Sequence, residues 1–539
     1  MTEQFIGSLL PLFVAVPLLF AGVSVILRRR MLDRVLIIAV PLLVLAAAIA
    51  LMIHHGDTPV LASAIGSYEG GIAIPFVSDT LTAVMLATTG LATAASCWFL
   101  TASGEDRLRF VPALALMLMS GVNGALLTGD LFNLFVFVEV MLLPSYALIA
   151  VTGTWRRLGI SRMFVIVNLV TSAILVMGVG LVYGSAGTVN LAALAGRAGE
   201  DPQVALAVTV VLLALAIKAG VVPVHGWMPR AYPGTSAGIM ALFSALHTKV
   251  ALYAIFRIYF TAFAPGGSAG TAGSTVTTPA PHGTATTVAV VIAVVVLATM
   301  VLGALGSLGE SRFRGVMAFQ MIAGVGHILI GVAIASPAAV AAGLFYLIHH
   351  VVTMASLLTT AGAVEQTYGT GILGKLSGLL HRDRLAAVVV ALGLLSLAGL
   401  PPTSGLWAKL GLALSVVGPE GGGGNPSWYA PVFLTAIVLA SVATLVALQR
   451  LWGKSFAGEP LRMYRPVLTD GSRDRGLEEA VPDSVRIPGR LLAPGVVMIG
   501  VSVLLFVFAG TLMPFIETAA AGLFETGPYV EAVLGGGIE

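Results

Sequence analysis

Two short stretches with the same pattern interrupt long apolar runs and decide the fold. The first, Ala-Gly-Val-Val-Pro-Val-His-Gly, occupies positions 219–226, and the second, Ala-Gly-Leu-Pro-Pro-Thr-Ser-Gly, occupies positions 398–405. They share the pattern A-G-x-x-P-x-x-G at a constant offset of 179 residues (398 minus 219). Gly and Pro free backbone groups that lipid cannot satisfy, so a broken apolar helix indicates a protein-lined or water-lined interior. The two stretches therefore predict an internal repeat with a broken helix in each copy.

The apolar runs around these breaks are too extensive for a soluble protein. The 539 residues are 58% apolar and only 10% charged, with a mean hydropathy of +0.99. A spanning helix needs about 20 mostly apolar residues. We expect fourteen such helices, at 5–27, 35–53, 79–101, 110–128, 131–152, 163–184, 203–223, 235–263, 286–308, 314–335, 338–363, 385–413, 429–453 and 491–515. The sequence thus predicts an all-α membrane protein with about 14 transmembrane helices.

The spacing of the two breaks divides these helices into two units of five. The fourth to eighth helices (110–263) form the first unit, and the ninth to thirteenth (286–453) form the second. An odd number of helices per unit inverts the second unit relative to the first. Residues 1–109 then hold helices 1–3, 454–490 form a charged loop, and 491–539 hold the last helix and a tail.

The basic residues fall in alternate loops, as expected for a multi-pass membrane protein. Lys and Arg are retained on the cytoplasmic side of a membrane. The loops that contain Arg28 to Arg34, Arg156 to Arg162 and Lys375 to Arg384 lie on one side, whereas those at 264–282 and 418–427 carry almost no basic residue. This pattern predicts a cell-membrane protein whose two termini are both extracytoplasmic and whose 454–490 loop is cytoplasmic.

Four charged residues lie where lipid would otherwise be. Glu139 lies midway along an apolar helix, Lys218 and Lys409 lie beside the two breaks, and Lys249 lies in the helix after the first break. Each unpaired Lys at the bilayer centre costs roughly 2.5–3.5 kcal/mol. Close approach of a Glu and a Lys favours their charged forms, whereas desolvation favours their neutral forms. A Glu139–Lys218 pair could therefore hold or release a proton as its geometry changes.

Histidines supply candidate proton carriers between the lysines, because histidine titrates nearest to neutral pH. The candidates are His247, two residues before Lys249, and His327, His349 and His350, which lie between Lys249 and the second break. His225, within the first break, is a further candidate, although it could simply shape the break. The sequence predicts a relay through Glu139, Lys218, Lys249, His327, His349, His350 and Lys409.

Several other functions find little support in the sequence. The basic residues form no continuous stripe, which argues against nucleic-acid binding. Cys97 is the only cysteine, so an internal disulfide is excluded, and no nucleotide-binding loop or cysteine cluster suggests a cofactor. A metal site on His327, His349 and His350 stays an alternative, but no carboxylate or cysteine set accompanies these histidines.

Three polar residues near helix ends have simpler interpretations. Asp79 and Asp130 begin helices, where a carboxylate caps free backbone N–H groups. Arg257 lies near the outward end of its helix and is expected to extend its charged group to the interface.

The run from Ile217 to Pro233, continuing through Ala241 to Tyr253, resembles the antiporter-like subunit family. This family includes the Mrp-type cation/proton antiporters and the proton-pumping subunits of respiratory NADH:quinone oxidoreductase. The runs from Gly129 to Glu139 and from Leu246 to Lys249 look most like the D-type subunits of Mrp Na+/H+ antiporters. The likeness covers most of the chain, including the fourteen-helix layout.

The resemblance implies roles and partners. It implies that Glu139 and Lys218 are a coupled pair, that Lys249 is the next proton carrier and that Lys409 is the terminal one. It also implies other Mrp-type subunits as partners in a plasma-membrane complex, with H+ and Na+ as the transported ions, and no enzymatic activity in this chain. Several relatives carry a lysine one turn after the histidine of the eleventh helix, where this chain has Met354. A proton-pumping subunit of a quinone- or hydrogenase-linked complex is the alternative.

Overall fold

Long apolar helices dominate the structure, a computed structural model that describes residues 3–27, 29–64, 66, 73–151, 155–264, 284–418, 429–459, 464–466 and 478–535. Twelve helical segments in these ranges are long and apolar enough to cross a membrane. Shorter apolar helices occupy the two remaining predicted positions: α5 (Val111–Leu127), and α16 (Arg384–Ala398) with α17 (Gly405–Val417). The prediction of an all-α membrane protein with about 14 spans is confirmed.

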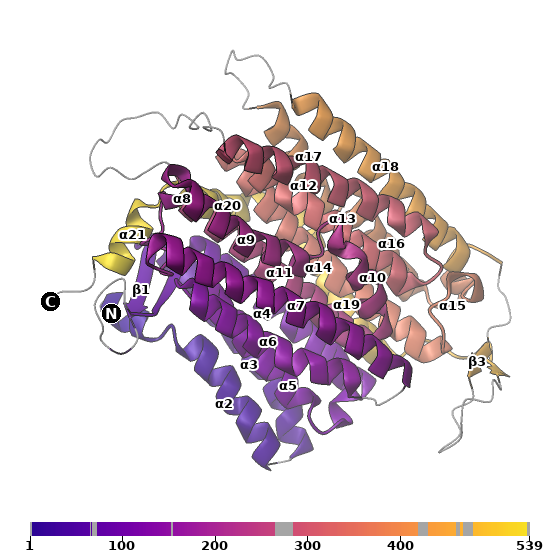
Figure 1. The fold of residues 1–539 in the computed structure, drawn as a ribbon. Coiled ribbons are helices and arrows are strands. Elements are labelled where there is room, and N and C mark those ends of the chain that lie inside the picture. Colours follow the sequence, from indigo (N-terminus) through magenta and orange to yellow (C-terminus); the bar gives the residue numbers. More distant parts are fainter. Residues whose placement is uncertain are drawn as a thin grey trace.

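Most long helices run side by side in one bundle (Figure 1). Besides α5, α16 and α17, these are α2 (Leu12–Leu27), α3 (Arg30–His54), α4 (Thr80–Ser103), α6 (Leu131–Ala150), α7 (Trp155–Ala186), α9 (Pro202–Ala219), α11 (Ala237–Ala262), α12 (Thr284–Gly309), α13 (Phe313–Ile334), α14 (Pro337–Tyr368), α18 (Ala430–Ser455) and α19 (Gly489–Val507). The remaining helices are α1 (Glu3–Ser8), α8 (Arg197–Glu200), α10 (Trp227–Ala231), α15 (Leu379–Arg382), α20 (Ala509–Phe524) and α21 (Gly527–Leu534).

Both predicted breaks occur, and both begin at a glycine. α9 ends at Ala219 before Gly220 (φ 81°), and α16 ends at Ala398 before Gly399 (φ 86°). A left-handed residue is a common way to end a helix, and glycine adopts it without the steric cost of a Cβ. A 3-10 turn and α10 follow the first break, whereas α17 follows the second. Each break contains a cis X–Pro peptide bond, Val222–Pro223 or Pro401–Pro402.

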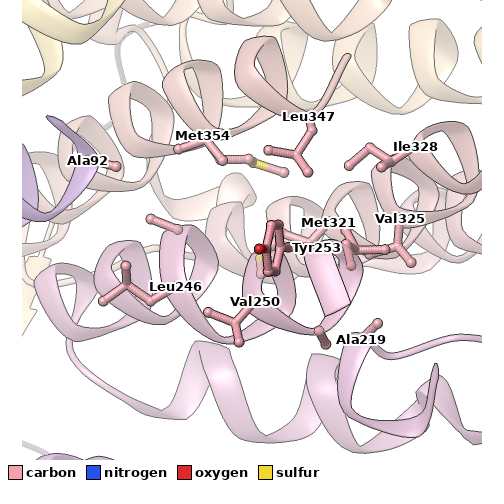
Figure 2. Close-up of a cluster of buried hydrophobic side chains, with 14 of the residues drawn as sticks. Ala92, Ala219, Leu246, Val250, Tyr253, Met321, Val325, Ile328, Leu347 and Met354 are labelled. Carbon is pink, nitrogen blue, oxygen red and sulfur yellow. The ribbon is translucent and has the colours of Figure 1, made fainter. Parts of the chain in front are cut away.

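The centre of the bundle is formed by α11 and α14, with α4 and α13 around them. In an apolar stretch of 18 residues, every residue of α11 is buried, and so are 94% of those of α14. In the corresponding stretch of α12 only 28% are buried. The buried helices α11 and α14 have a lower mean hydropathy (1.6 each) than α12 (3.0), because polar side chains find partners inside the protein whereas a helix that faces lipid must be apolar. Figure 2 shows part of this core, with Leu246, Val250 and Tyr253 on α11 and Leu347 and Met354 on the neighbouring α14.

Two small antiparallel hairpins lie outside the predicted elements. β1 (Val60–Ala64) pairs with β2 (Pro75–Asp79), with Val60 opposite Asp79, and β3 (Tyr464–Pro466) pairs with β4 (Glu478–Ala480). α1 and α21 both pack on β1, so the described N- and C-terminal segments lie at one end of the bundle, which we call the terminal end (Figure 1). The predicted loops at 265–282 and 419–427, and most of 460–477, lie outside the described residues.

The predicted last helix at 491–515 is wrong in its extent. α19 ends at Val507, and after Phe508 a second helix, α20, packs against α4 and α14. Gly510 and Pro514 lie in the first two turns of α20. Both residues weaken a continuous helix, because glycine is flexible and proline cannot donate a backbone hydrogen bond. The apolar content of the segment hid this division.

Close packing of α12 on α13 gives a test of the fold. A Cβ added at Gly303 would lie 2.4 Å from the backbone N of Ala323, whereas one at Gly180 of α7 would meet nothing within 4 Å. We expect Gly303→Ala to destabilise the protein by about 1–3 kcal/mol, as overpacking usually does. Gly180→Ala should leave the thermal midpoint of the purified protein unchanged or slightly raised. Equal midpoints for the two variants would contradict the described packing.

Candidate functional site

Glu139 and Lys218 lie on two helices that both pack against α7. Glu139, on α6, is partly exposed, and its Oε1 accepts a hydrogen bond from the hydroxyl of Ser172. Lys218, in the last turn of α9, is 2% exposed, and its Nζ donates to Oδ1 of Asn168 over 3.3 Å. Asn168 and Ser172 lie one turn apart on α7. Among the described residues no direct ion pair joins Glu139 to Lys218, so two polar side chains of α7 connect them.

Lys249 contacts His350, and this contact joins α11 to α14. Both residues are completely buried. The Nζ of Lys249 lies 3.2 Å from Nδ1 of His350 and 3.2 Å from the hydroxyl of Thr248. The other ring nitrogen of His350 lies 3.4 Å from the backbone O of Gln320 on α13. The structure therefore brings together two of the predicted carriers.

Gly324 of α13 leaves the space that the His350 ring fills. A Cβ at this position would lie 2.2 Å from Nε2 of His350, well inside the sum of the van der Waals radii. Glycine is therefore required at position 324, because the His350 ring lies too close to the α13 backbone for any larger side chain.

Aromatic and hydroxyl groups surround the other two predicted histidines. The ring of His327 stacks on that of Tyr346 with centroids 4.8 Å apart, and its Nδ1 donates to the O of Ala323 over 2.8 Å. The Nδ1 of His349 lies 2.9 Å from the hydroxyl of Ser404, and the rings of His349 and Tyr346 lie edge to face at 5.4 Å. The Nε2 atoms of both histidines are buried and have no hydrogen-bond partner among the described residues.

Lys409 of α17 lies against the second break. Its Nζ donates to the backbone O of Ala398 over 3.1 Å and to the hydroxyl of Ser441 on α18 over 3.0 Å. The last carbonyl groups of a helix have no partner within that helix. Lys409 thus satisfies one of the carbonyls at the end of α16. No direct hydrogen bond joins it to His327 or His349 in the described part of the chain.

Two further histidines lie near the first break. His247 of α11 lies 2.8 Å from the hydroxyl of Ser145 on α6, and its ring packs on Phe243 at 4.7 Å. His225 is partly exposed in the turn after α9, and its buried Nδ1 has no partner among the described residues. The structure does not bring His225 into hydrogen-bond contact with another predicted carrier in the described ranges.

Four polar residues that bind the predicted carriers were not predicted from the sequence. These are Asn168 and Ser172 on α7, Gln320 on α13 and Ser404 at the second break. Ser404 lies at the repeat position of His225 (225 plus 179), so the repeat itself could have identified it. Asn168 and Ser172 have the four-residue spacing that puts side chains on one helix face, which is a weaker signal.

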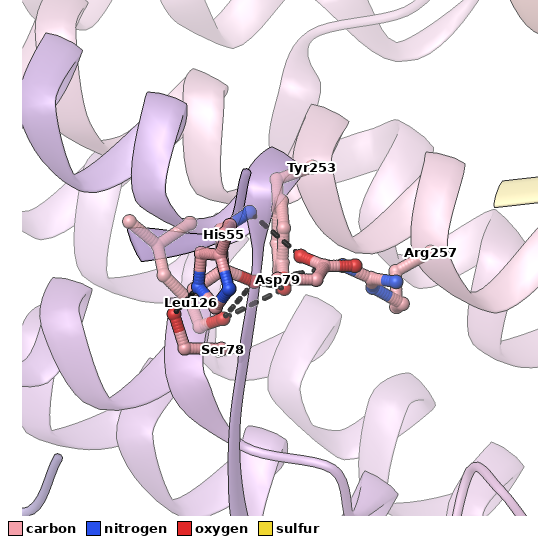
Figure 3. A network of polar contacts seen from close by, with 7 residues as sticks. His55, Ser78, Asp79, Leu126, Tyr253 and Arg257 are labelled. Atoms are coloured by element: carbon pink, nitrogen blue, oxygen red, sulfur yellow. Dashed lines mark hydrogen bonds and ion pairs between the residues drawn. The ribbon is translucent and has the colours of Figure 1, made fainter. Parts of the chain in front are cut away.

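The prediction for Arg257 was wrong, whereas the capping roles of Asp79 and Asp130 are confirmed. Asp79 accepts from the backbone N of Thr82 over 2.9 Å, and Asp130 accepts from that of Asn133 over 2.7 Å. Arg257 is only 4% exposed and donates to both carboxylate oxygens of Asp79, at 2.7 and 2.6 Å (Figure 3). It does not extend to an interface, because a carboxylate partner lies within the protein.

Comparison with known proteins identifies the family. Residues 128–420, more than half of the chain, match the family described as NADH:quinone oxidoreductase/Mrp antiporter, TM. The chain is also 30% identical over 476 residues to the D-type subunit of the Na(+)/H(+) antiporter of Bacillus subtilis, with 87% of each chain covered. The chain belongs to the NADH:quinone oxidoreductase/Mrp antiporter family. The resemblance noted in the sequence is therefore confirmed.

Two further comparisons extend this family membership over nearly the whole chain. The D-type subunit of the Na(+)/H(+) antiporter of Alkalihalophilus pseudofirmus is 29% identical over 501 residues, which is 92% of each chain. A chain in the structure of the Mrp complex from Dietzia sp. is 40% identical, with a TM-score of 0.88 and coverage of 99% of this chain and 100% of that one. The segment matched to the antiporter family contains every predicted carrier from Glu139 to Lys409.

The space that Gly324 leaves for His350 gives a test of the contact between Lys249 and His350. Gly324→Ala should displace the His350 ring away from Lys249, because the new Cβ would overlap Nε2. Gly411→Ala on α17 is the matched control, since its nearest neighbour would be 3.5 Å away. A cryo-EM map of the assembled variant would measure the Lys249–His350 distance. An unchanged ring position in Gly324→Ala would contradict the described geometry.

Proposed function

We propose that this chain is the proton-translocating subunit of a multisubunit monovalent cation/proton antiporter, with Na+ as the cation. The observation that carries this proposal is the buried contact between Lys249 and His350, which connects titratable groups on both sides of the bundle centre. Intramembrane ionisable residues usually mark an ion pathway. The chain acts as a transporter subunit and catalyses no chemical step of its own.

In this mechanism Glu139 and Lys218 form the switch of the first unit. Ser172 and Asn168 hold the two charged groups on one face of α7. A change in the tilt or rotation of α7 would alter the distance between the carboxylate and the amine. Separation removes the stabilisation that each charge gives the other, so Lys218 releases its proton more readily.

The second part of the mechanism carries the proton from Lys249 to Lys409. Lys249 passes it to Nδ1 of His350, and His349 and His327 continue the relay around the Tyr346 ring. The unpaired Nε2 atoms of His327 and His349 are positions where bridging water would bind. Met354 packs in the apolar cluster of Figure 2 and has no group that could carry a proton, so the proposed relay passes through the histidines. His225 has a lesser role.

The proposed units and topology follow the sequence prediction. Residues 110–263 and 286–453 form two inverted units, preceded by 1–109 and followed by the 454–490 arm and the 491–539 tail. The arm is cytoplasmic and both termini are extracytoplasmic, in a plasma membrane. α1 and α21 both pack on β1, which supports the placement of both termini on the same side.

The proposed partners are the other subunits of an Mrp-type complex. Glu139 supports this, because a partly exposed carboxylate on a membrane-spanning helix needs a protein or water neighbour. A place in a quinone- or hydrogenase-linked complex is the other function that the family allows. Proton movement driven by a sodium gradient favours the antiporter, and proton movement that requires an electron donor favours the other function.

Sodium-driven proton exchange in everted vesicles tests the proposed switch. Glu139→Ala or Lys218→Ala should reduce exchange by roughly 100-fold or more, the usual contribution of a positioned proton donor or acceptor. Glu200→Gln, in the exposed part of α8, should exchange as the wild type does. Assembly is checked by co-purification of the complex. Normal exchange by both switch variants in assembled complexes would reject the proposal.

A further inference from the structure

Arg257 lies on the same face of α11 as Lys249. Lys249, Tyr253 and Arg257 follow each other at four-residue spacing, which places them in one row along a helix. Eight residues of helix rise about 12 Å. The row leads from Lys249 toward the terminal end of the bundle, where Asp79 joins β2 to α4. A straight route out of the membrane for a proton on Lys249 would therefore pass Arg257.

Hydroxyl groups form a nearly continuous chain along the second half of this route. The hydroxyl of Tyr253 lies 2.9 Å from that of Thr82 and donates to the O of Leu126 over 2.7 Å. Thr82 also contacts Asp79, because its backbone N–H donates a hydrogen bond to Oδ1 of Asp79 over 2.9 Å. Beyond Asp79, Nε2 of His55 lies 2.9 Å from the hydroxyl of Ser78 (Figure 3). Hydroxyl, carboxyl and imidazole groups can each accept and donate a proton.

Arg257 binds the carboxylate at which this chain arrives, that of Asp79. A guanidinium group has five N–H donors, accepts no hydrogen bond and keeps its proton in proteins. Its Nη2 occupies both oxygens of Asp79, and its Cζ lies 5.6 Å from the ring centroid of Tyr253 and 5.1 Å from that of Tyr529. A proton cannot hop through such a group.

A comparison of two carboxylates shows what Arg257 does to Asp79. Asp79 and Asp130 are both buried N-caps at the terminal end. Burial raises the pKa of each carboxyl, and it leaves that of Asp130 above its usual value. At Asp79 the charge of Arg257 and the bond from Thr82 outweigh burial, so its pKa lies below the usual value. Asp79 is thus held ionised and cannot take up a proton at neutral pH.

Four other titratable groups lie near the Arg257–Asp79 pair in the described part of the chain. These groups are His55, Asp130, Tyr253 and Tyr529. Burial lowers the pKa of His55, so its ring is neutral at neutral pH. One turn from Tyr253 on α11, the buried ring of Phe256 lies close to Gly331 of α13 and Gly343 of α14 and adds apolar atoms to this side of the row.

We infer that Arg257, bound to Asp79, is a seal that stops protons on Lys249 from leaving directly through the terminal end. The seal forces each proton sideways to His350 and so keeps proton movement coupled to the cation. This inference rests on the proposed relay. Arg257 is a positioning residue, because it contacts none of the predicted carriers and acts by keeping Asp79 ionised and occupied.

Passive proton leak through the assembled complex tests the seal. In sodium-free vesicles, Arg257→Gln should speed the decay of an imposed pH gradient by at least roughly tenfold, equivalent to a barrier lower by about 1.4 kcal/mol. The reason is that Asp79, freed from the cation, becomes a protonatable carboxyl like Asp130. Arg257→Lys keeps the charge and should stay near the wild-type leak. Asp79→Asn with Arg257→Gln removes the carboxyl and should also be tight.

The outcomes separate this inference from the proposed function. A leaky Arg257→Gln and two tight variants support the seal, whereas an equally leaky double variant or an assembled Arg257→Gln as tight as the wild type overturns it. If Arg257→Gln does not assemble, Arg257→Met replaces it with the same expected leak. Sodium-driven exchange, measured separately in the Glu139 and Lys218 variants, reports on the relay and not on the seal.

Discussion

A charged side chain at membrane depth must be enclosed by protein or water, and this requirement governs the arrangement around Lys249. The helix that carries it, α11, is enclosed by α4, α9, α13 and α14. Each enclosing helix must then either offer Lys249 a polar partner or pack tightly against α11. His350 supplies the partner from α14, and Gly324 of α13 gives the histidine its space.

The same requirement applies at the two breaks, which have the same backbone features but different hydrogen-bond donors. Each break leaves helix-end carbonyl groups that need donors. At the first break the indole N–H of Trp227 donates to the O of Ile217 over 3.1 Å, and at the second Nζ of Lys409 donates to the O of Ala398. Lys409 is therefore bound to the break itself, whereas Lys218 points to α7. The repeat fixes where the charges lie and not what they bind.

Local rules account for what could be predicted from the sequence. The fourteen spans follow from apolar length, the breaks from Gly and Pro, and the buried charges from their cost in lipid. The partners of those charges could not be predicted, because the rotation of an apolar helix depends on tertiary packing. Arg257 shows this most clearly, since its partner Asp79 is 178 residues away in sequence. The division between α19 and α20 was missed because both helices are apolar.

The central claim is that the two halves of the chain form one proton path, and Lys409 tests it most directly. Sodium-driven proton exchange should be measured in everted vesicles with Lys409→Ala, and with Lys454→Ala at the exposed end of α18 as the control. We expect Lys409→Ala to lose exchange although the complex assembles and Glu139, Lys218 and Lys249 are intact. Exchange at the level of the Lys454→Ala control would contradict it.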